Sequence, residues 1–197
     1  MQGESVTKCS WCVDGNLLEA YHDNEWGVPC HDDAALFEYL MLECMSCGLS
    51  WKLMLVKRDI FRTCFAGFDV KRVAAFVADD VDRILQTPGM IRSRRKVEAV
   101  VGNARCFIKI QQEYGSFDAY LWAFTGGKTL VYKRHLEGQW LTRNELSDRV
   151  AADLRARGFK FLGSTLVYSF LQGVGLVNDH DVSCPQFALL GGDVVDA

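Results

Sequence analysis

Proline is scarce in this chain, and linker-like sequence is missing. Only 3 of the 197 residues are proline, and no serine- and glycine-rich or low-complexity run interrupts the sequence. No internal repeat is visible, which argues against repeat architectures. At this length, and with 49% hydrophobic residues, we expect one domain spanning residues 1–197 around a sizeable core.

A leader sequence and a long apolar run are also missing. Residues 1–8 are polar, which is not the pattern of a secretory signal. The longest uncharged run, residues 161–178, contains three glycines and a glutamine, so it is expected to be a buried helix. We therefore expect a cytoplasmic protein without membrane contact.

Positive charge is not in excess, because the formal net charge is −3. This balance disfavours a uniformly basic nucleic-acid-binding protein but leaves room for a local basic patch. Four basic residues do cluster after a Pro-Gly turn: Arg92, Arg94, Arg95 and Lys96. A helix, a turn at Gly89 and a second helix over residues 93–114 have the form of a helix-hairpin-helix element, whose backbone N–H groups suit a phosphate. The alternative is a plain helical turn with a solvated basic face.

Cysteine is frequent, with 8 residues and no secretory features, so reduced thiols or metal ligands are expected rather than disulfides. Two C-x-x-C pairs could form a four-cysteine zinc site: Cys9 with Cys12 and Cys44 with Cys47. The second pair lies inside residues 36–49, which are predicted to form an apolar helix, and the gap between the pairs exceeds the usual zinc-ribbon spacing.

Helix-start signals recur along the chain, whereas alternating strand patterns do not. The predicted N-caps are Asp32 or Asp33, Ser50, Asp69, Asp79 or Asp80, and Thr142 in a capping box with Glu145. Gly158 is a suitable stop for the last of these helices. The predicted fold class is all-α.

Residues 20–29 are dense in aromatic, carboxylate and carboxamide side chains and fit neither a helical nor a strand period. They are predicted to form a turn-rich segment that lines a site or plugs the core. Candidate pocket aromatics are Trp11, Tyr21, Trp26 and Trp51. Glu43 lies in apolar company on a predicted helix, where an unpaired carboxylate is costly.

The motif Tyr-His-Asp-Asn-Glu-Trp-Gly-Val-Pro, residues 21–29, resembles the signature of the 3-methyladenine DNA glycosylase I family. Further blocks within residues 42–51, 91–105 and 157–180 match in the same order. The resemblance spans about residues 9–184.

This resemblance implies an all-α, helix-hairpin-helix DNA glycosylase-like fold. The helix-hairpin-helix would occupy residues 80–114, and a structural zinc would join segments 9–30 and 160–185, with residues 186–197 as a flexible tail. The implied zinc ligands are Cys9, His22, His180 and Cys184, a closed set without an open position. From the residues alone, a buried cysteine or a hydrogen-bonded histidine is favoured over a metal ligand at any of these positions.

The resemblance also implies an activity. The enzyme would flip N3-methyladenine out of alkylated double-stranded DNA and hydrolyse its N-glycosidic bond, with water as the nucleophile. Free 3-methyladenine would be the product, and we expect a monomer. Tyr21 and Glu43 would hydrogen-bond the base, Trp51 would stack on it, and Glu43 is the catalytic candidate. The expected DNA contacts are Gly89, Arg92, Arg94 and Arg95.

Two other functions fit some of these features: a silent lesion- or DNA-binding module, and a zinc-dependent hydrolase of another substrate. Three positions depart from the family pattern: Leu18 replaces a tyrosine, and Ser46 and Cys47 replace Gln-Ala. These departures bear on base preference more than on the reaction.

Overall fold

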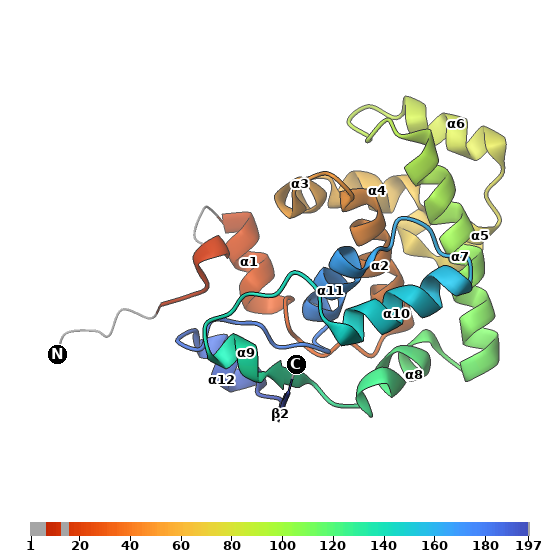
Figure 1. Ribbon diagram of the computed structural model, residues 1–197. Helices are drawn as coiled ribbons and strands as arrows, with labels where there is room; N and C mark the ends of the chain where they lie inside the picture. Colours follow the sequence, from red (N-terminus) through yellow and green to blue (C-terminus); the bar gives the residue numbers. More distant parts are fainter. Residues whose placement is uncertain (1–6, 13–15, 197) are drawn as a thin grey trace.

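The computed structural model describes residues 7–12 and 16–196, which are mostly helical (Figure 1). The α-helices are α1 (Asn16–Asn24), α2 (Asp33–Ser46), α3 (Trp51–Val56), α4 (Arg58–Cys64), α5 (Val70–Ala74), α6 (Ala78–Gln86), α7 (Arg94–Tyr114), α8 (Phe117–Trp122), α9 (Lys133–Leu136), α10 (Glu145–Ala156), α11 (Ser164–Gly173) and α12 (Pro185–Leu190). Short 3-10 turns occupy Ser10–Cys12, Ala66–Phe68 and Ala123–Thr125. The predicted helical class is confirmed.

Two short strands qualify the all-α prediction. The strands β1 (Leu130–Tyr132) and β2 (Asp193–Val195) pair in parallel, with Leu130 opposite Asp193. Three residues are too few to show an alternating pattern, and the two partners are far apart in the sequence. The segment 186–197, expected to be a flexible tail, contains most of α12 and all of β2, and its flexibility stays a prediction.

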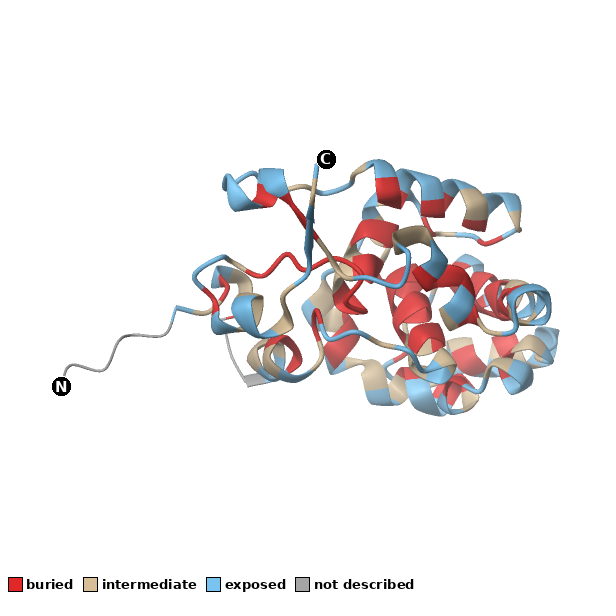
Figure 2. Cartoon of the chain, turned by 90° about the horizontal axis from the view of Figure 1, so that it is seen from below, coloured by how far each residue is buried: buried red, intermediate tan, exposed pale blue. Residues whose placement is uncertain are grey.

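The core is built around α2, which packs against α7 and α11. From Leu36 to Ser46 almost every residue of α2 is buried, so this helix is covered on all sides. Figure 2 shows the buried residues gathered on the central helices and the exposed residues on the outer faces. From Leu36 onward, nearly every side chain of α2 therefore lies in the interior.

Several helices begin where local capping chemistry predicts. Asp32 accepts the Ala35 N–H at 2.8 Å, and Ser50 accepts the Leu53 N–H at 3.3 Å. Asp69 caps α5 in the same way. These side chains satisfy N–H groups that the first helical turn leaves without partners.

Two capping predictions are wrong in detail. α10 is capped by Asn144 and Ser147 rather than by Thr142 and Glu145, because Ser147 bonds back to the Asn144 N–H at 2.9 Å. α6 begins at Ala78 after Val77, and Asp80 accepts the Val77 N–H at 3.0 Å. Both errors are shifts of two or three residues along a correctly placed helix.

The segment 20–29 is also partly corrected, since its first half continues helix α1 as far as Asn24. Its second half approaches the end of α11 closely. Gly175 has φ +80°, and a Cβ there would lie 2.5 Å from the Pro29 nitrogen. A glycine is therefore required for this approach.

Segments near the two ends of the described chain lie on the same side of the molecule, where Figure 1 shows α1, α9 and α12. Gln186 on α12 donates to the Asp23 carbonyl on α1 at 3.0 Å. Among the described residues, no helix combines the length and the apolar character needed to cross a membrane.

Candidate active site and metal site

A cavity of about 280 Å³ opens between α1, α2, the start of α3 and α11. Its lining residues are Trp11, Tyr21, Trp26, Glu43, Ser46, Leu49, Trp51, Leu166, Ser169 and Gln172. The cavity thus collects all four aromatic candidates and the candidate carboxylate.

Aromatic rings form the walls of this cavity. The Tyr21 and Trp51 rings are 5.4 Å apart at 51°, and the Trp11 and Trp26 rings are 4.9 Å apart at 81°. The Trp51 Nε1–H is buried and has no hydrogen-bond partner within residues 7–12 and 16–196. Tilted rings and a free donor suit a flat ligand that carries polar atoms at its edge.

Glu43 is the buried carboxylate of the cavity, with 5% of its surface exposed. Burial raises its pKa to about 8. The Ser46 hydroxyl lies 3.2 Å from its Oε2 and acts against that rise. No cation pairs with Glu43 in the part of the chain that is described. An unpaired buried carboxylate of this kind is typical of a site that meets a charged or donor-rich ligand.

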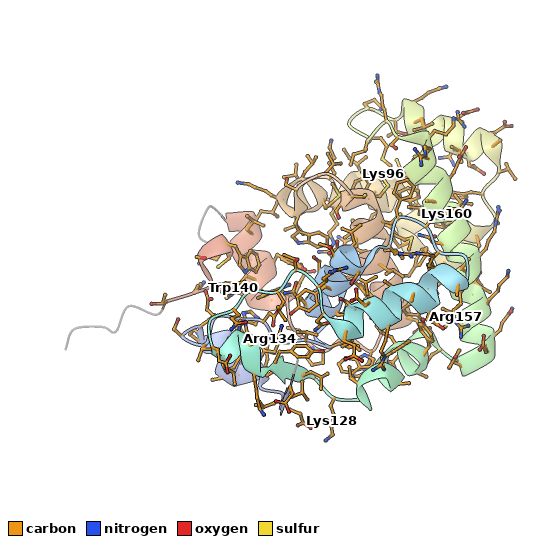
Figure 3. The ribbon with its side chains drawn as sticks, in the orientation of Figure 1. Lys96, Lys128, Arg134, Trp140, Arg157 and Lys160 are labelled. Atoms are coloured by element: carbon orange, nitrogen blue, oxygen red, sulfur yellow. The ribbon has the colours of Figure 1, made fainter. Side chains whose placement is uncertain are left out.

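Lys96 holds the end of the helix that carries Glu43. It comes from the first turn of α7 and donates to the carbonyls of Met45 at 2.9 Å and Cys47 at 2.6 Å (Figure 3). A cation at these carbonyls complements the negative end of α2. The prediction that Lys96 belongs to an exposed basic patch is therefore wrong, because its side chain is buried.

A cluster of two cysteines and two histidines lies beside the cavity. Cys9, His22, His180 and Cys184 place their ligand atoms within 4.8 Å of one another. The His22 Nε2 to His180 Nδ1 distance is 3.1 Å, and Cys9 Sγ to His180 Nδ1 is 3.5 Å. A tetrahedral zinc with these donors spaces neighbouring ligand atoms about 3.3–3.8 Å apart. The residues therefore fit a four-coordinate zinc.

The second nitrogen of each histidine is fixed by an outer contact. The His22 Nδ1 lies 2.8 Å from the Asp23 carboxylate, and the His180 Nε2 lies 3.1 Å from the Trp26 carbonyl. The Asp181 N–H donates to the Cys9 sulfur at 3.2 Å. Such contacts orient the inward-facing atoms of metal ligands.

The competing four-cysteine site does not form. Cys12 donates to the Cys9 carbonyl, and Cys44 donates to the Lys160 carbonyl at 3.7 Å. Among the described residues, one group has its ligand atoms close enough together to hold a metal ion, and it consists of Cys9, His22, His180 and Cys184.

The basic turn lies between α6 and α7. Gly89 has φ +80°, and its carbonyl accepts from Lys57. Arg92, Arg94 and Arg95 are exposed. Arg94 pairs with Asp82 and Glu98, and Arg95 lies over the Phe161 ring at 5.8 Å.

A comparison of the sequence with protein-family models identifies the family of the protein that contains this site. Residues 11–187 match the model of the methyladenine glycosylase family. The chain belongs to the methyladenine glycosylase family. The resemblance deduced from residues 21–29 and the three later blocks is thereby confirmed.

Individual relatives agree with this methyladenine glycosylase assignment. DNA-3-methyladenine glycosylase 1 of Escherichia coli (strain K12) is 43% identical over 179 residues, covering 91% of this chain and 96% of that protein. DNA-3-methyladenine glycosylase of Haemophilus influenzae is 38% identical, with 91% and 97% covered. The structure of 3-methyladenine DNA glycosylase I from Staphylococcus aureus has a TM-score of 0.85 and 35% identity over 92% of this chain and 97% of that one.

The departures from the methyladenine glycosylase pattern have different surroundings. Ser46 lines the cavity and contacts the Glu43 carboxylate, so it alters the hydrogen bonds of the pocket. Cys47 contributes a carbonyl to Lys96. Leu18 packs against the core and does not line the cavity.

Sequence reasoning missed four cavity residues: Leu49, Leu166, Ser169 and Gln172. Three of them lie on α11, more than 100 residues after Glu43 in the sequence. No local spacing connects α11 to α2, so only the tertiary packing reveals them.

Proposed function

We propose that this chain is a DNA glycosylase that excises 3-methyladenine from alkylated double-stranded DNA as a single-domain monomer. The observation that carries the proposal is the buried Glu43 inside an aromatic-walled cavity. The names of the E. coli and H. influenzae relatives support it, as does the S. aureus structure, which concerns 3-methyladenine recognition.

The chemistry of the cavity suits a cationic base. Methylation at N3 gives the base a positive charge, so it is already an activated leaving group. The base must leave the helical stack to enter the cavity, where Tyr21 and Trp51 offer aromatic faces. The ionised Glu43 would accept hydrogen bonds from the base and stabilise positive charge.

The proposed reaction is hydrolysis. The bond between the sugar C1′ and the base nitrogen breaks, and its electron pair neutralises the base. Water adds a hydroxyl to C1′ and releases one proton. The products are free 3-methyladenine and an abasic site, and the reaction forms no covalent enzyme intermediate.

A structural zinc at Cys9, His22, His180 and Cys184 belongs to this proposal. When bound, the ion would close the tetrahedron and hold the two ends of the chain together, since no position is left for water. Trp11 is two residues from Cys9 and Trp26 contacts the His180 ring at 4.4 Å, so the cluster supports one wall of the cavity.

Release of free base tests the proposed function. Methylated duplex DNA incubated with the protein should yield free 3-methyladenine, measured by chromatography, at a rate that rises with enzyme concentration. Tight binding to methylated DNA without any release would instead identify a silent lesion-binding module.

The basic turn between α6 and α7 is proposed to bind the phosphates of DNA, as a helix-hairpin-helix element does. Replacing Arg92, Arg94 and Arg95 with alanine should weaken binding to all duplex sequences alike. The slope of log affinity against log salt should also flatten, by about one for each lost phosphate contact. Fluorescence anisotropy at several salt concentrations measures both effects.

The matched control removes three charges on the opposite side of the molecule: Lys128, Lys133 and Arg134. Figure 3 places Lys128 and Arg134 away from α6 and α7. This variant should keep the affinity and salt slope of the wild type. Equal losses in both variants would show that net charge, rather than this turn, determines binding.

A further inference from the structure

We propose that Gln172 reads position 6 of the bound purine and that Asp179 sets the direction of its amide. The side-chain carbonyl of Gln172 would accept a hydrogen bond from the exocyclic amino group of adenine. The same carbonyl would oppose the O6 atom of a guanine-type base. This inference rests on the proposed function and names a determinant of its selectivity.

Gln172 lies on α11 and lines the same cavity as Glu43 and Trp51. Its backbone is fixed, because its carbonyl accepts the Gly27 N–H at 3.1 Å and the Gly175 N–H at 3.2 Å. The side chain therefore starts from a defined point in the cavity wall.

The side-chain amide of Gln172 has one orientation that gives the Asp179 carboxylate a hydrogen-bond donor. Its Nε2 lies 2.7 Å from the Oδ2 of Asp179, which is 3% exposed. This contact places the NH₂ end of the amide, which only donates, against the carboxylate oxygen of Asp179. The Tyr168 hydroxyl donates to the same Oδ2 at 2.5 Å and holds the carboxylate in place.

The carbonyl end of the Gln172 amide remains available to accept a hydrogen bond from a ligand in the cavity. Gln172 Oε1 has no hydrogen-bond partner within residues 7–12 and 16–196, and it is not a buried unsatisfied atom, so it is accessible. Oxygen and nitrogen diverge from the same amide carbon, which turns Oε1 away from Asp179. Because Gln172 lines the cavity, we assign this acceptor to the space where the base is proposed to bind.

This acceptor distinguishes two kinds of purine. The amino group of 3-methyladenine offers two N–H donors, so Gln172 takes one without displacing a contact to Glu43. In 3-methylguanine, position 6 is an oxygen acceptor, and two facing acceptors leave both unpaired. Sites that hydrogen-bond one substrate group reject analogues without it more strongly than apolar pockets do.

Two variants test the assignment through the ratio of 3-methyladenine to 3-methylguanine released from one methylated duplex. Gln172→Met keeps the side-chain length and removes the acceptor. We expect 3-methyladenine excision to fall about 10- to 100-fold, without a matching fall for 3-methylguanine. Gln112→Met makes the same change at an exposed position of α7 and should leave the ratio unchanged.

Asp179→Asn tests the amide direction separately. The new amide can donate to Gln172 Oε1, which would turn the Gln172 NH₂ toward the cavity. A donor there favours O6, so 3-methylguanine release should rise while 3-methyladenine release falls. A purely structural role for Asp179 would lower both rates together.

The outcomes separate this inference from the proposed function. Wild type that releases 3-methyladenine, with an unchanged base ratio in folded Gln172→Met and Asp179→Asn proteins, overturns the role of Gln172 alone. Wild type that releases neither base removes the proposed function and this inference together. Thermal melting identifies a variant that fails to fold. In that case, the ratio of 3-methyladenine to 3-methylguanine released by the other variant tests the role of Gln172.

Discussion

A protein in which His180 and Cys184 are both replaced by alanine is expected to lose its metal and much of its stability. The wild type should carry about one equivalent of zinc, and the double variant close to none. Binding of a structural metal contributes directly to folding free energy. A loss of about 5 kcal/mol would lower the melting temperature by roughly 10–20 °C in a domain of this size. Elemental analysis and thermal melting measure the two effects.

The control for this variant removes the other pair of nearby cysteines, Cys44 and Cys47. Neither belongs to the ligand cluster, so zinc content should stay at one equivalent even if packing around Cys44 costs some stability. Zinc that persists without His180 and Cys184, or a metal-free protein with the full melting temperature, would contradict the structural zinc.

Glu43→Gln is expected to slow excision by about tenfold to a hundredfold. The amide keeps the shape of the side chain but loses its charge and one acceptor. Loss of a charge-assisted hydrogen bond costs about 1.5–3 kcal/mol, which corresponds to this range of rates. Single-turnover release of 3-methyladenine measures the chemical step. A Glu43→Gln protein with a normal excision rate would show that Glu43 contributes to packing and not to catalysis.

The pH dependence of kcat/KM should reflect the ionisation of the Glu43 carboxylate. Burial raises the pKa of Glu43 to about 8, so the neutral form dominates in the free enzyme below that pH. If the carboxylate is the active form, kcat/KM should rise as pH increases through about 8 and then level off. Glu43→Gln has no ionisable group there, so the rise should disappear. A wild-type profile without this rise would show that ionisation of Glu43 does not limit the reaction.

The same raised pKa carries a cost in stability at high pH. An acid whose pKa is higher in the folded state binds its proton more tightly there than in the unfolded chain. Its contribution to stability therefore declines as pH rises from the ordinary glutamate value to about 8 and stays constant above that pH. Glu43→Gln should flatten this part of the stability profile.

Local chemistry made much of the helical fold predictable. Asp32, Ser50 and Asp69 cap their own helices through contacts two or three residues away, so the sequence contains the whole signal. The segment 20–29 was harder, because its side chains serve the cavity and the metal cluster instead of an amphipathic stripe. Helix α1 was missed for that reason.

The candidate site was predictable to a different extent. Glu43 stands out as a carboxylate in apolar sequence, and the aromatic candidates all reach the cavity. The metal cluster joins residues 171 positions apart, a relation that spacing alone does not show and that came from the family resemblance. Gln172 and the burial of Lys96 depend on contacts between distant helices, which no local pattern encodes.

The contact between Cys9 and His180 has a consequence for the newly made chain. These residues are 171 positions apart, so at about 5–20 residues per second the first waits roughly 10–35 s for the second to be synthesised. For most of that interval α2 also lacks α11, one of the helices it packs against, and the cavity lacks the lining residues that α11 carries. Closure of the pocket is thus a late event of biosynthesis, and a chain stalled after α10 would lack the cavity wall that α11 supplies.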